Sequence, residues 1–374
     1  MGLPVLQLPS LVFDNVYQFL DVPEVIFLSQ CSKRMEDLVK SKEDPRKSLR
    51  VAIWKEYTNV EIVRRIDEDQ SSELDVLRSK ICLEWKIYSK SIRKSASSQD
   101  IAKLNIDGTN WNVGKDFHDT YHEEWYWYSV AKKGAYEQDI LALVKMLRNL
   151  FNCPISNICH YYRKDSSFQK LLVDTDVLHR ADLIFVDQQK FKLRHLNFMF
   201  DHFITDYLIF NAYSGKDYSY QKALLFPKID LYNATWINLE KLFEMSKTSR
   251  IITLHGAILM SDKDLNQFIK WWLISDIKTL ETVTVGRRRF NTSKRPGQEA
   301  WMNIPVIMDG IPSTPEKKKR EEALPSHLDW YDWGRPGRGF DITRKDGVQA
   351  TMLVNGEIDY ETFAFVVWHQ NPYV

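Results

Sequence analysis

Apolar residues near the start of the chain recur at helical spacing. Over 8–20 they step at i, i+4, i+7 and i+8, which is the pattern of one helical face. They are Val12, Val16, Phe19 and Leu20. Pro9 suits the first turn of this helix, because the N–H that proline lacks has no partner there. Pro23 followed by Glu24 predicts a second helix start, where negative charge favours the positive end of the dipole.

A helical unit of about 40 residues buries little apolar surface by itself. Two interpretations follow. The unit is either a docking module whose exposed face is covered by another subunit, or an N-terminal cap on a larger domain. The periodicity of the apolar positions does not separate these two.

A second pattern, apolar-x-x-apolar-x-apolar, recurs in the second half of the chain and predicts short strands. Its central residues are Ile158, Ile184, Leu208, Ile229, Ile252 and Val283. Their spacings are 26, 24, 21, 23 and 31 residues. All but the last fall within the period of about 20–29 residues that is typical of leucine-rich-repeat arcs. The asparagine ladder of typical leucine-rich repeats is missing, since Asn211 and Asn233 do not sit at the expected offset.

Helical stripes accompany these strands. Glu137–Phe151 predicts a strong helix that ends at Asn152 and Pro154. Further stripes occur at 236–243 and 265–272, the second after a capping-box-like Ser261. Alternating strands and helices predict parallel strands stacked side by side in a solenoid. The alternative is a compact α/β domain with irregular units.

If the strand register is right, the positions between the apolar ones face a binding partner. These are Asp230, Tyr232, Thr253, His255, Thr282 and Thr284. An extended strand face of this kind is a usual protein-binding surface of solenoids.

Composition narrows the function classes. The 374 residues are 44% hydrophobic, and 51 Lys and Arg balance 50 Asp and Glu, so no global field attracts nucleic acid or a membrane. Four scattered cysteines without a CxxC pair favour an intracellular protein. Neither a signal peptide nor a membrane-spanning apolar run is evident. We expect a cytoplasmic or nuclear location and no contact with a membrane.

Two kinds of candidate site compete with structural interpretations. His118 and His122 would share a helix face and could bind zinc, or they belong to an aromatic surface patch. The basic runs 287–295 and 317–320 could bind nucleic acid, or they are solvated loops. We favour the structural interpretation in both cases. Nothing predicts an enzyme, a catalytic residue, a metal or a cofactor.

The N-terminal pattern resembles an F-box. The resemblance rests on Leu8-Pro9, on the apolar register that follows, and on the ending Cys31-Ser32-Lys33-Arg34-Met35. Many F-boxes have Trp where this chain has Met35. The resemblance implies docking on the Skp-type adaptor of a cullin ubiquitin ligase. The residues implied in docking are Leu8, Pro9, Val12, Val16, Leu20, Val25 and Leu28.

Three C-terminal stretches look like the type-2 F-box-associated region of the F-box family expanded in nematodes. They are Ser261–Trp272, Phe340–Thr351 and Phe363–Trp368. The resemblance implies that this region binds a target protein, whose identity the sequence does not give. The chain would then be a substrate-recognition subunit of an SCF-type ubiquitin ligase, and a nucleic-acid-binding or general protein-interaction solenoid is the alternative.

The expected organisation is α+β or α/β, with a small helical F-box followed by a degenerate leucine-rich-repeat-like solenoid that ends in a β-hairpin region. The expected parts are an F-box at 1–48, a helical and aromatic connecting region at 49–135, a repeat-like F-box-associated domain at 136–290, a basic loop or linker at 291–335 and a C-terminal β region at 336–374.

Overall fold

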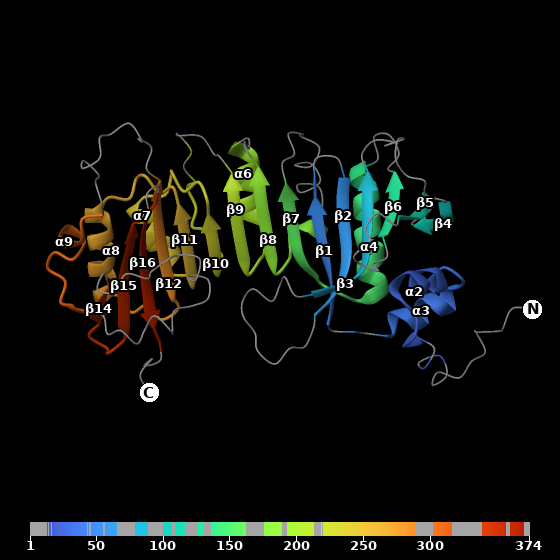
Figure 1. Ribbon diagram of the computed structural model, residues 1–374, viewed down its shortest axis with the longest axis horizontal. Coiled ribbons are helices and arrows are strands. Elements are labelled where there is room, and N and C mark those ends of the chain that lie inside the picture. The colour runs from blue at the N-terminus through green and yellow to red at the C-terminus, as the bar shows by residue number, and fades with distance from the viewer. Residues whose placement is uncertain are drawn as a thin grey trace, which may run out of the picture. The chain divides into compact units, whose positions relative to one another are not determined.

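The computed structural model describes residues 13, 15, 17–42, 44, 46–54, 57–65, 79–88, 100–106, 109–116, 126–130, 136–161, 176–188, 193–212, 218, 220–288, 302–315, 339–356 and 360–369. The chain divides into two compact units, Met1–Ile184 and Phe185–Val374. Helices and β-strands occur in both units, so the fold is α+β, as the sequence predicts (Figure 1).

The first unit begins with the short helices expected of the N-terminal pattern. Helix α2 spans Val22–Ser29 and α3 spans Lys33–Lys40. Phe13, Asn15 and Tyr17 are also helical. Helix α2 contacts strand β3, and α3 contacts helix α4.

A sheet forms the body of the first unit, with strand order β7-β1-β2-β3-β6-β5-β4. The strands are β1 Lys47–Ile53, β2 Tyr57–Arg65, β3 Ser79–Tyr88, β4 Asp100–Ile106, β5 Thr109–Asp116, β6 Tyr126–Val130 and β7 Ile155–Tyr161. β1 pairs in parallel with β7 and β3 with β6, and the other neighbouring strands of this sheet are antiparallel.

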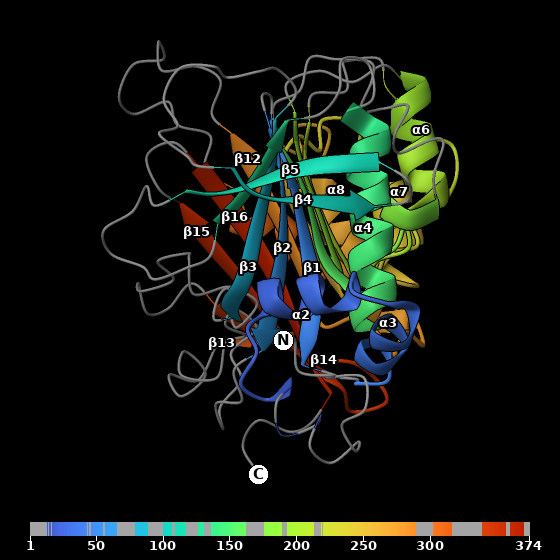
Figure 2. The ribbon, with the colours of Figure 1, turned by 90° about the vertical axis from the view of Figure 1, so that its right-hand side faces the viewer.

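Helix α4, Tyr136–Phe151, lies along one face of the strands of this unit (Figure 2). Its predicted apolar stripe is buried, including Ile140, Val144 and Leu147. The predicted end at Asn152 is confirmed, because Asn152 takes a φ of 45°. This left-handed conformation stops a helix, and Asn tolerates it better than most residues.

The prediction of a helical region at 49–135 is wrong for the described residues, which form strands β1 to β6. Strand β1 begins at Lys47, inside the expected F-box boundary at 48. The alternation that marks a half-buried strand was present, with Leu49, Val51 and Ile53 buried between more exposed neighbours. Farther along the chain, the many aromatic residues made this alternation of apolar and polar positions hard to recognise.

In the second unit the strands that the recurring apolar pattern predicts are parallel and share a register. The strands are β8 Leu183–Gln188, which spans the division between the units, β9 Tyr207–Ala212, β10 Lys228–Leu231, β11 Ile251–His255 and β12 Thr282–Arg288. Ile229 pairs with both Leu208 and Ile252, and Ile252 pairs with Val283. Four of the six central residues of the sequence pattern are therefore direct neighbours across the sheet. The other two, Ile158 in β7 and Ile184 in β8, belong to the first unit.

Helices α6 Leu193–His202, α7 Leu239–Ser246 and α8 Asp262–Ile274 follow strands of this series. The predicted capping box of α8 is present, with Ser261 and Asp264 bonded reciprocally. The stripe of α8 is fully buried, and Trp272 packs edge-on against Phe365 at 5.0 Å between ring centroids. These large side chains form the core beneath α8.

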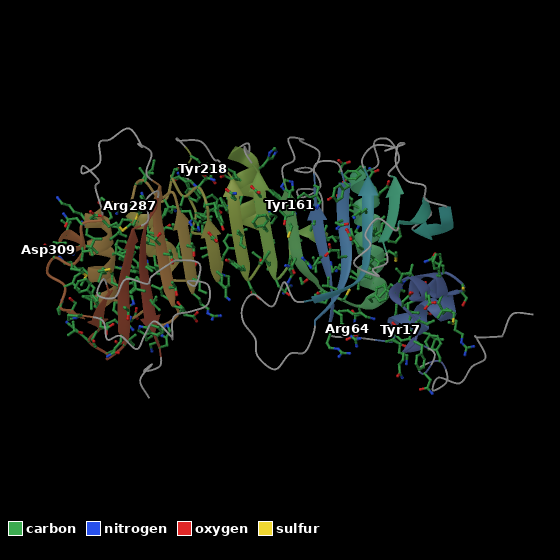
Figure 3. The ribbon with its side chains drawn as sticks, viewed as in Figure 1. Tyr17, Arg64, Tyr161, Tyr218, Arg287 and Asp309 are labelled. Atoms are coloured by element: carbon green, nitrogen blue, oxygen red, sulfur yellow. The ribbon has the colours of Figure 1, made fainter. Side chains whose placement is uncertain are left out.

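Between β9 and β10 the described residues 218 and 220–227 contain no helix. Aromatic side chains fill this place, and Phe200 packs against Tyr220 and Phe226. The Tyr220 hydroxyl donates to Asp201 Oδ1 at 2.6 Å. Figure 3 marks Tyr218, whose hydroxyl donates to Asn197 at 3.0 Å.

A short polar ladder joins the ends of β8 and β9 to the turn after β10. Asn211 donates from Nδ2 to Asp187 Oδ1, and Asn233 donates to Asn211 Oδ1, each at 3.1 Å. The two asparagines thus bond to each other although they do not sit at the offset of a typical asparagine ladder.

Antiparallel strands complete the second unit beyond β12. They are β16 Tyr360–Trp368, β15 Gln349–Gly356, β14 Gly339–Thr343 and β13 Thr314–Pro315, in that order from β12. Within the expected β-hairpin region, a turn at Asp346-Gly347 joins β14 to β15, and Gly347 has a φ of 88°, which suits glycine. The expected linker at 291–335 also contains α9, Ile304–Ile307, which Asn266 of α8 fixes through bonds to the carbonyls of Ile307 and Asp309, each 2.8 Å.

The buried Arg344 joins the hairpin to helix α8. Its guanidinium forms two bonds to Asp346, of 2.9 and 2.7 Å, and donates to the carbonyl of Ile277 at 2.9 Å. The same group lies 5.0 Å from the centre of the Trp272 ring. A planar guanidinium can make all these contacts at once, whereas an ammonium cannot.

We predict that Arg344→Ala lowers the free energy of unfolding of the second unit by about 2 kcal/mol, because it removes hydrogen bonds to a charged group and a ring contact. Urea unfolding followed by tryptophan fluorescence measures this change. The exposed neighbour provides the control, since Lys345→Ala should change stability by less than about 0.5 kcal/mol. Equal effects of the two substitutions would contradict the assigned role.

The pH dependence of stability gives a second prediction. Arg344, together with the backbone N–H of Val348, lowers the pKa of Asp346 from 3.8 to about 2. A carboxyl with a lowered pKa stabilises the folded state above its unfolded pKa, and this contribution is lost as the pH falls from about 4 to about 2. Asp346→Asn should therefore flatten the fall in thermal midpoint across this window. The exposed Asp276→Asn should leave the slope unchanged, and the opposite ranking would refute the assignment.

Candidate adaptor-docking and target-binding surfaces

Reciprocal capping fixes the start of helix α2. The Asp21 side chain accepts from the Glu24 N–H, and the Glu24 carboxylate accepts from the Asp21 N–H, both at 2.9 Å. Pro23 lies in the first turn, as its fixed φ favours. Helix α3 begins in a similar way, with the Ser32 hydroxyl accepting from the N–H of Met35 at 3.2 Å.

The apolar residues of this small unit divide between its interior and its surface. The buried ones are Phe13, Val22, Val25, Ile26, Met35 and Val39. Met35, where many F-boxes have Trp, is fully buried, so it fills a packing position here. By contrast, Phe19 is 87% exposed, and Leu20, Phe27 and Leu28 are half-buried.

Tyr17 links the F-box segment to the rest of the first unit (Figure 3). The Lys47 ammonium lies 6.0 Å from the centre of the Tyr17 ring and 5.4 Å from that of Phe151 in α4. Burial, and secondly the charge of Asp44, raises the pKa of Tyr17, which keeps the phenol neutral. The helices are therefore anchored on one side and open on the other.

Of the predicted docking residues, Leu20 and Leu28 are partly exposed, while Val25 packs inward. Leu8, Pro9, Val12 and Val16 lie outside the described residues. The sequence-based list omitted Phe19 and Phe27. The helical spacing identified Phe19 as apolar, but only the turn at residues 18–19 gives it its exposure.

The predicted target-facing residues lie on the strand face opposite α7 and α8, and their exposure differs. Asp230, Thr253 and Thr284 are direct partners across β10, β11 and β12. Asp230 is buried, as are Thr282 and Thr284 of β12, so the expectation that these three residues face outward into solvent is wrong. Strand β16, which pairs with β12, makes this position central in the sheet, and its sequence separation from β12 hid this arrangement.

Tyr232, His255 and Asp230 form a cluster where β10 and β11 end. The Tyr232 and His255 rings stack at 4.5 Å between centroids with 22° between planes. His255 Nε2 lies 3.3 Å from Asp230 Oδ1. Of the predicted set, Tyr232, Thr253 and His255 retain access to solvent, while Asp230 is buried beside them.

The structure describes few residues of the two alternative sites, the histidine pair and the basic runs. Figure 3 marks Arg287, whose Nη1 donates to Asp262 Oδ1 at 2.7 Å, so one residue of the first basic run is engaged within the chain. Arg289, Lys294 and the run 317–320 lie outside the described residues, as do His118 and His122. Within the described ranges no group of three His, Cys, Asp or Glu side chains could hold a metal. The helices that the structure describes include none able to cross a membrane.

Comparison with protein families agrees with both resemblances. A family model described as an F-box domain matches residues 5–47, the segment that contains α2 and α3. A model described as F-box associated matches residues 222–285, which contain β10, α7, β11, α8 and the start of β12. Neither the curated proteins nor the solved structures give a match. The chain thus contains an N-terminal F-box domain and an F-box-associated region of the second type, as both resemblances imply.

Proposed function

We propose that the protein is the substrate-recognition subunit of an SCF-type ubiquitin ligase, acting in the cytoplasm or nucleus. Its F-box docks on a Skp-type adaptor of a cullin ligase, and the second unit binds a target protein. F-box proteins are in general non-catalytic adaptors. Ubiquitin transfer then depends on other subunits, because holding the target nearby raises its effective concentration at the conjugating enzyme.

The observation that carries the proposal is the exposed apolar surface of the F-box, formed by Phe19, Leu20, Phe27 and Leu28. Phe19 is 87% exposed, so covering its side chain with a partner lowers the free energy of the complex. The opposite side of the same helices is closed by packing against α4 and β3. The surface therefore suits a partner without requiring the helices to leave their own unit.

The F-box-associated region supports the second half of the proposal. Its parallel strands β9 to β12 share one register, and side chains at the ends of β10 and β11 remain accessible. An extended strand surface presents several side chains at fixed spacing, which favours recognition of another polypeptide. Tyr232, Thr253 and His255 are the accessible members of the predicted set.

We predict that Phe19→Ser weakens binding of the Skp-type adaptor by roughly tenfold to a hundredfold, because covering a phenylalanine contributes about 1.5–3 kcal/mol. Titration of the purified chain with the adaptor by isothermal calorimetry measures the dissociation constant. The thermal midpoint should not fall, since Phe19 is exposed in the free chain.

The matched control is Ile274→Ser, which alters a similarly exposed apolar residue at the end of α8 in the second unit. It should leave adaptor affinity unchanged. Should the Phe19 and Ile274 variants bind the adaptor equally well, the F-box surface would not be the docking site.

A further inference from the structure

The cluster at the ends of β10 and β11 contains Asp230, whose carboxylate lacks a hydrogen-bond donor from the described ranges at one of its oxygens. Asp230 is only 8% exposed, and its Oδ1 atom accepts no hydrogen bond from the part of the chain that the structure describes. Its closest nitrogen, His255 Nε2, is 3.3 Å away. Buried carboxylates are normally held by several donors, so this one is poorly satisfied in the free protein.

The residues around Asp230 do not supply the missing donor. Its neighbour across β11 is Thr253, and the next residue in that row is Thr284, whose Oγ1 is itself buried without a partner. On the other side of His255 lies Gly286, which has no side chain. A Cβ built there would be 3.6 Å from His255 Nδ1, so the glycine leaves space beside the imidazole.

An aromatic surface adjoins the carboxylate. Tyr232 is 44% exposed and stacks on His255 with one face. Burial, and secondly the charge of Asp230, raises the pKa of Tyr232, so the ring remains a neutral phenol. An aromatic face beside a carboxylate favours a cation, and a planar guanidinium can stack on the ring while it donates to the carboxylate.

Exposed apolar side chains lie next to this cluster. Ile258 and Leu259 follow β11 in a loop that the Ala257 N–H fixes to the carbonyl of Gly286 at 3.1 Å. Gly256 takes a φ of 69°, and a Cβ on it would be 3.7 Å from the carbonyl oxygen of Tyr232. The loop therefore begins beside Tyr232, and a ligand at the cluster has apolar surface within reach.

We propose that Asp230, Tyr232 and His255 form a subsite for an arginine side chain of the target polypeptide, with Ile258 and Leu259 contacting an apolar residue beside it. This deepens the proposed function and rests on its target-binding half. The guanidinium donates to the Asp230 carboxylate and lies on the exposed face of Tyr232. His255 positions both residues through its stacking and its contact with Asp230.

The test is selection of binders from a random peptide library displayed on phage, with the intact protein bound to its adaptor as bait. We expect the selected peptides to be enriched in arginine next to an apolar residue. A selected peptide should bind on the order of tenfold more weakly to Asp230→Asn and to Tyr232→Ala, because each removes a contact to the guanidinium. Replacing its arginine by citrulline, which keeps the shape and removes the charge, should cause a similar loss.

Asp276→Asn removes an exposed carboxyl elsewhere in the same unit and should leave peptide affinity unchanged. Tyr232→Ala alters an exposed side chain, so it keeps the test valid should Asp230→Asn fail to fold. The inference is overturned if no peptides are selected, if they lack basic enrichment, or if citrulline binds as well as arginine. Adaptor binding is measured on the same protein samples. Failure of the intact chain to bind the adaptor would refute the proposed ligase role, independently of the result with peptides.

Discussion

Packing of the two short F-box helices against the first unit is the interaction on which the account depends. Helices of eight residues, such as α2 and α3, are marginal in isolation and take their stability from tertiary contacts. Here α3 contacts α4 and α2 contacts β3. The Lys47 ammonium also lies near the rings of both Tyr17 and Phe151. With the buried side supplied by its own chain, the unit can leave Phe19 in solvent without losing its fold. The segment therefore packs on one side as a cap would, and its open apolar side is the surface that the docking interpretation requires, which stays a prediction.

The second unit also consists of short elements that are stable only through packing against their neighbours. Each strand of the parallel series is too short to bury a core alone, so its apolar face is completed by its neighbours and by a helix. Between β9 and β10, where the described residues form no helix, Phe200 packs against Tyr220 and Phe226. The Asp187–Asn211–Asn233 ladder satisfies polar groups along the strand ends. The opposite face of the sheet carries polar side chains that are buried without a hydrogen-bond partner among the described residues. Asp230 is the clearest example.

The sequence predicted those features that local periodicity or capping chemistry determines. The α8 stripe with its Ser261 capping box, the end of α4 at Asn152 and the shared register of Leu208, Ile229, Ile252 and Val283 belong to this class. Features set by distant pairing were missed. The strands in 49–135 were taken for helices, and Thr284 was expected in solvent because its pairing with Ala364 joins residues far apart in sequence. For the same reason the sequence could name the apolar residues of the F-box but not separate buried Val25 from exposed Phe19.

Hydrogen exchange of the intact chain, with and without the Skp-type adaptor, tests the central claim most directly. The account predicts slower exchange of amides in residues 17–31 when the adaptor is bound, with no change in α4, because that side is already closed. Strands β10 to β12 should exchange at the same rate in both samples. If the F-box segment gains no protection from saturating adaptor, or if protection appears only in the second unit, the proposed docking surface is wrong.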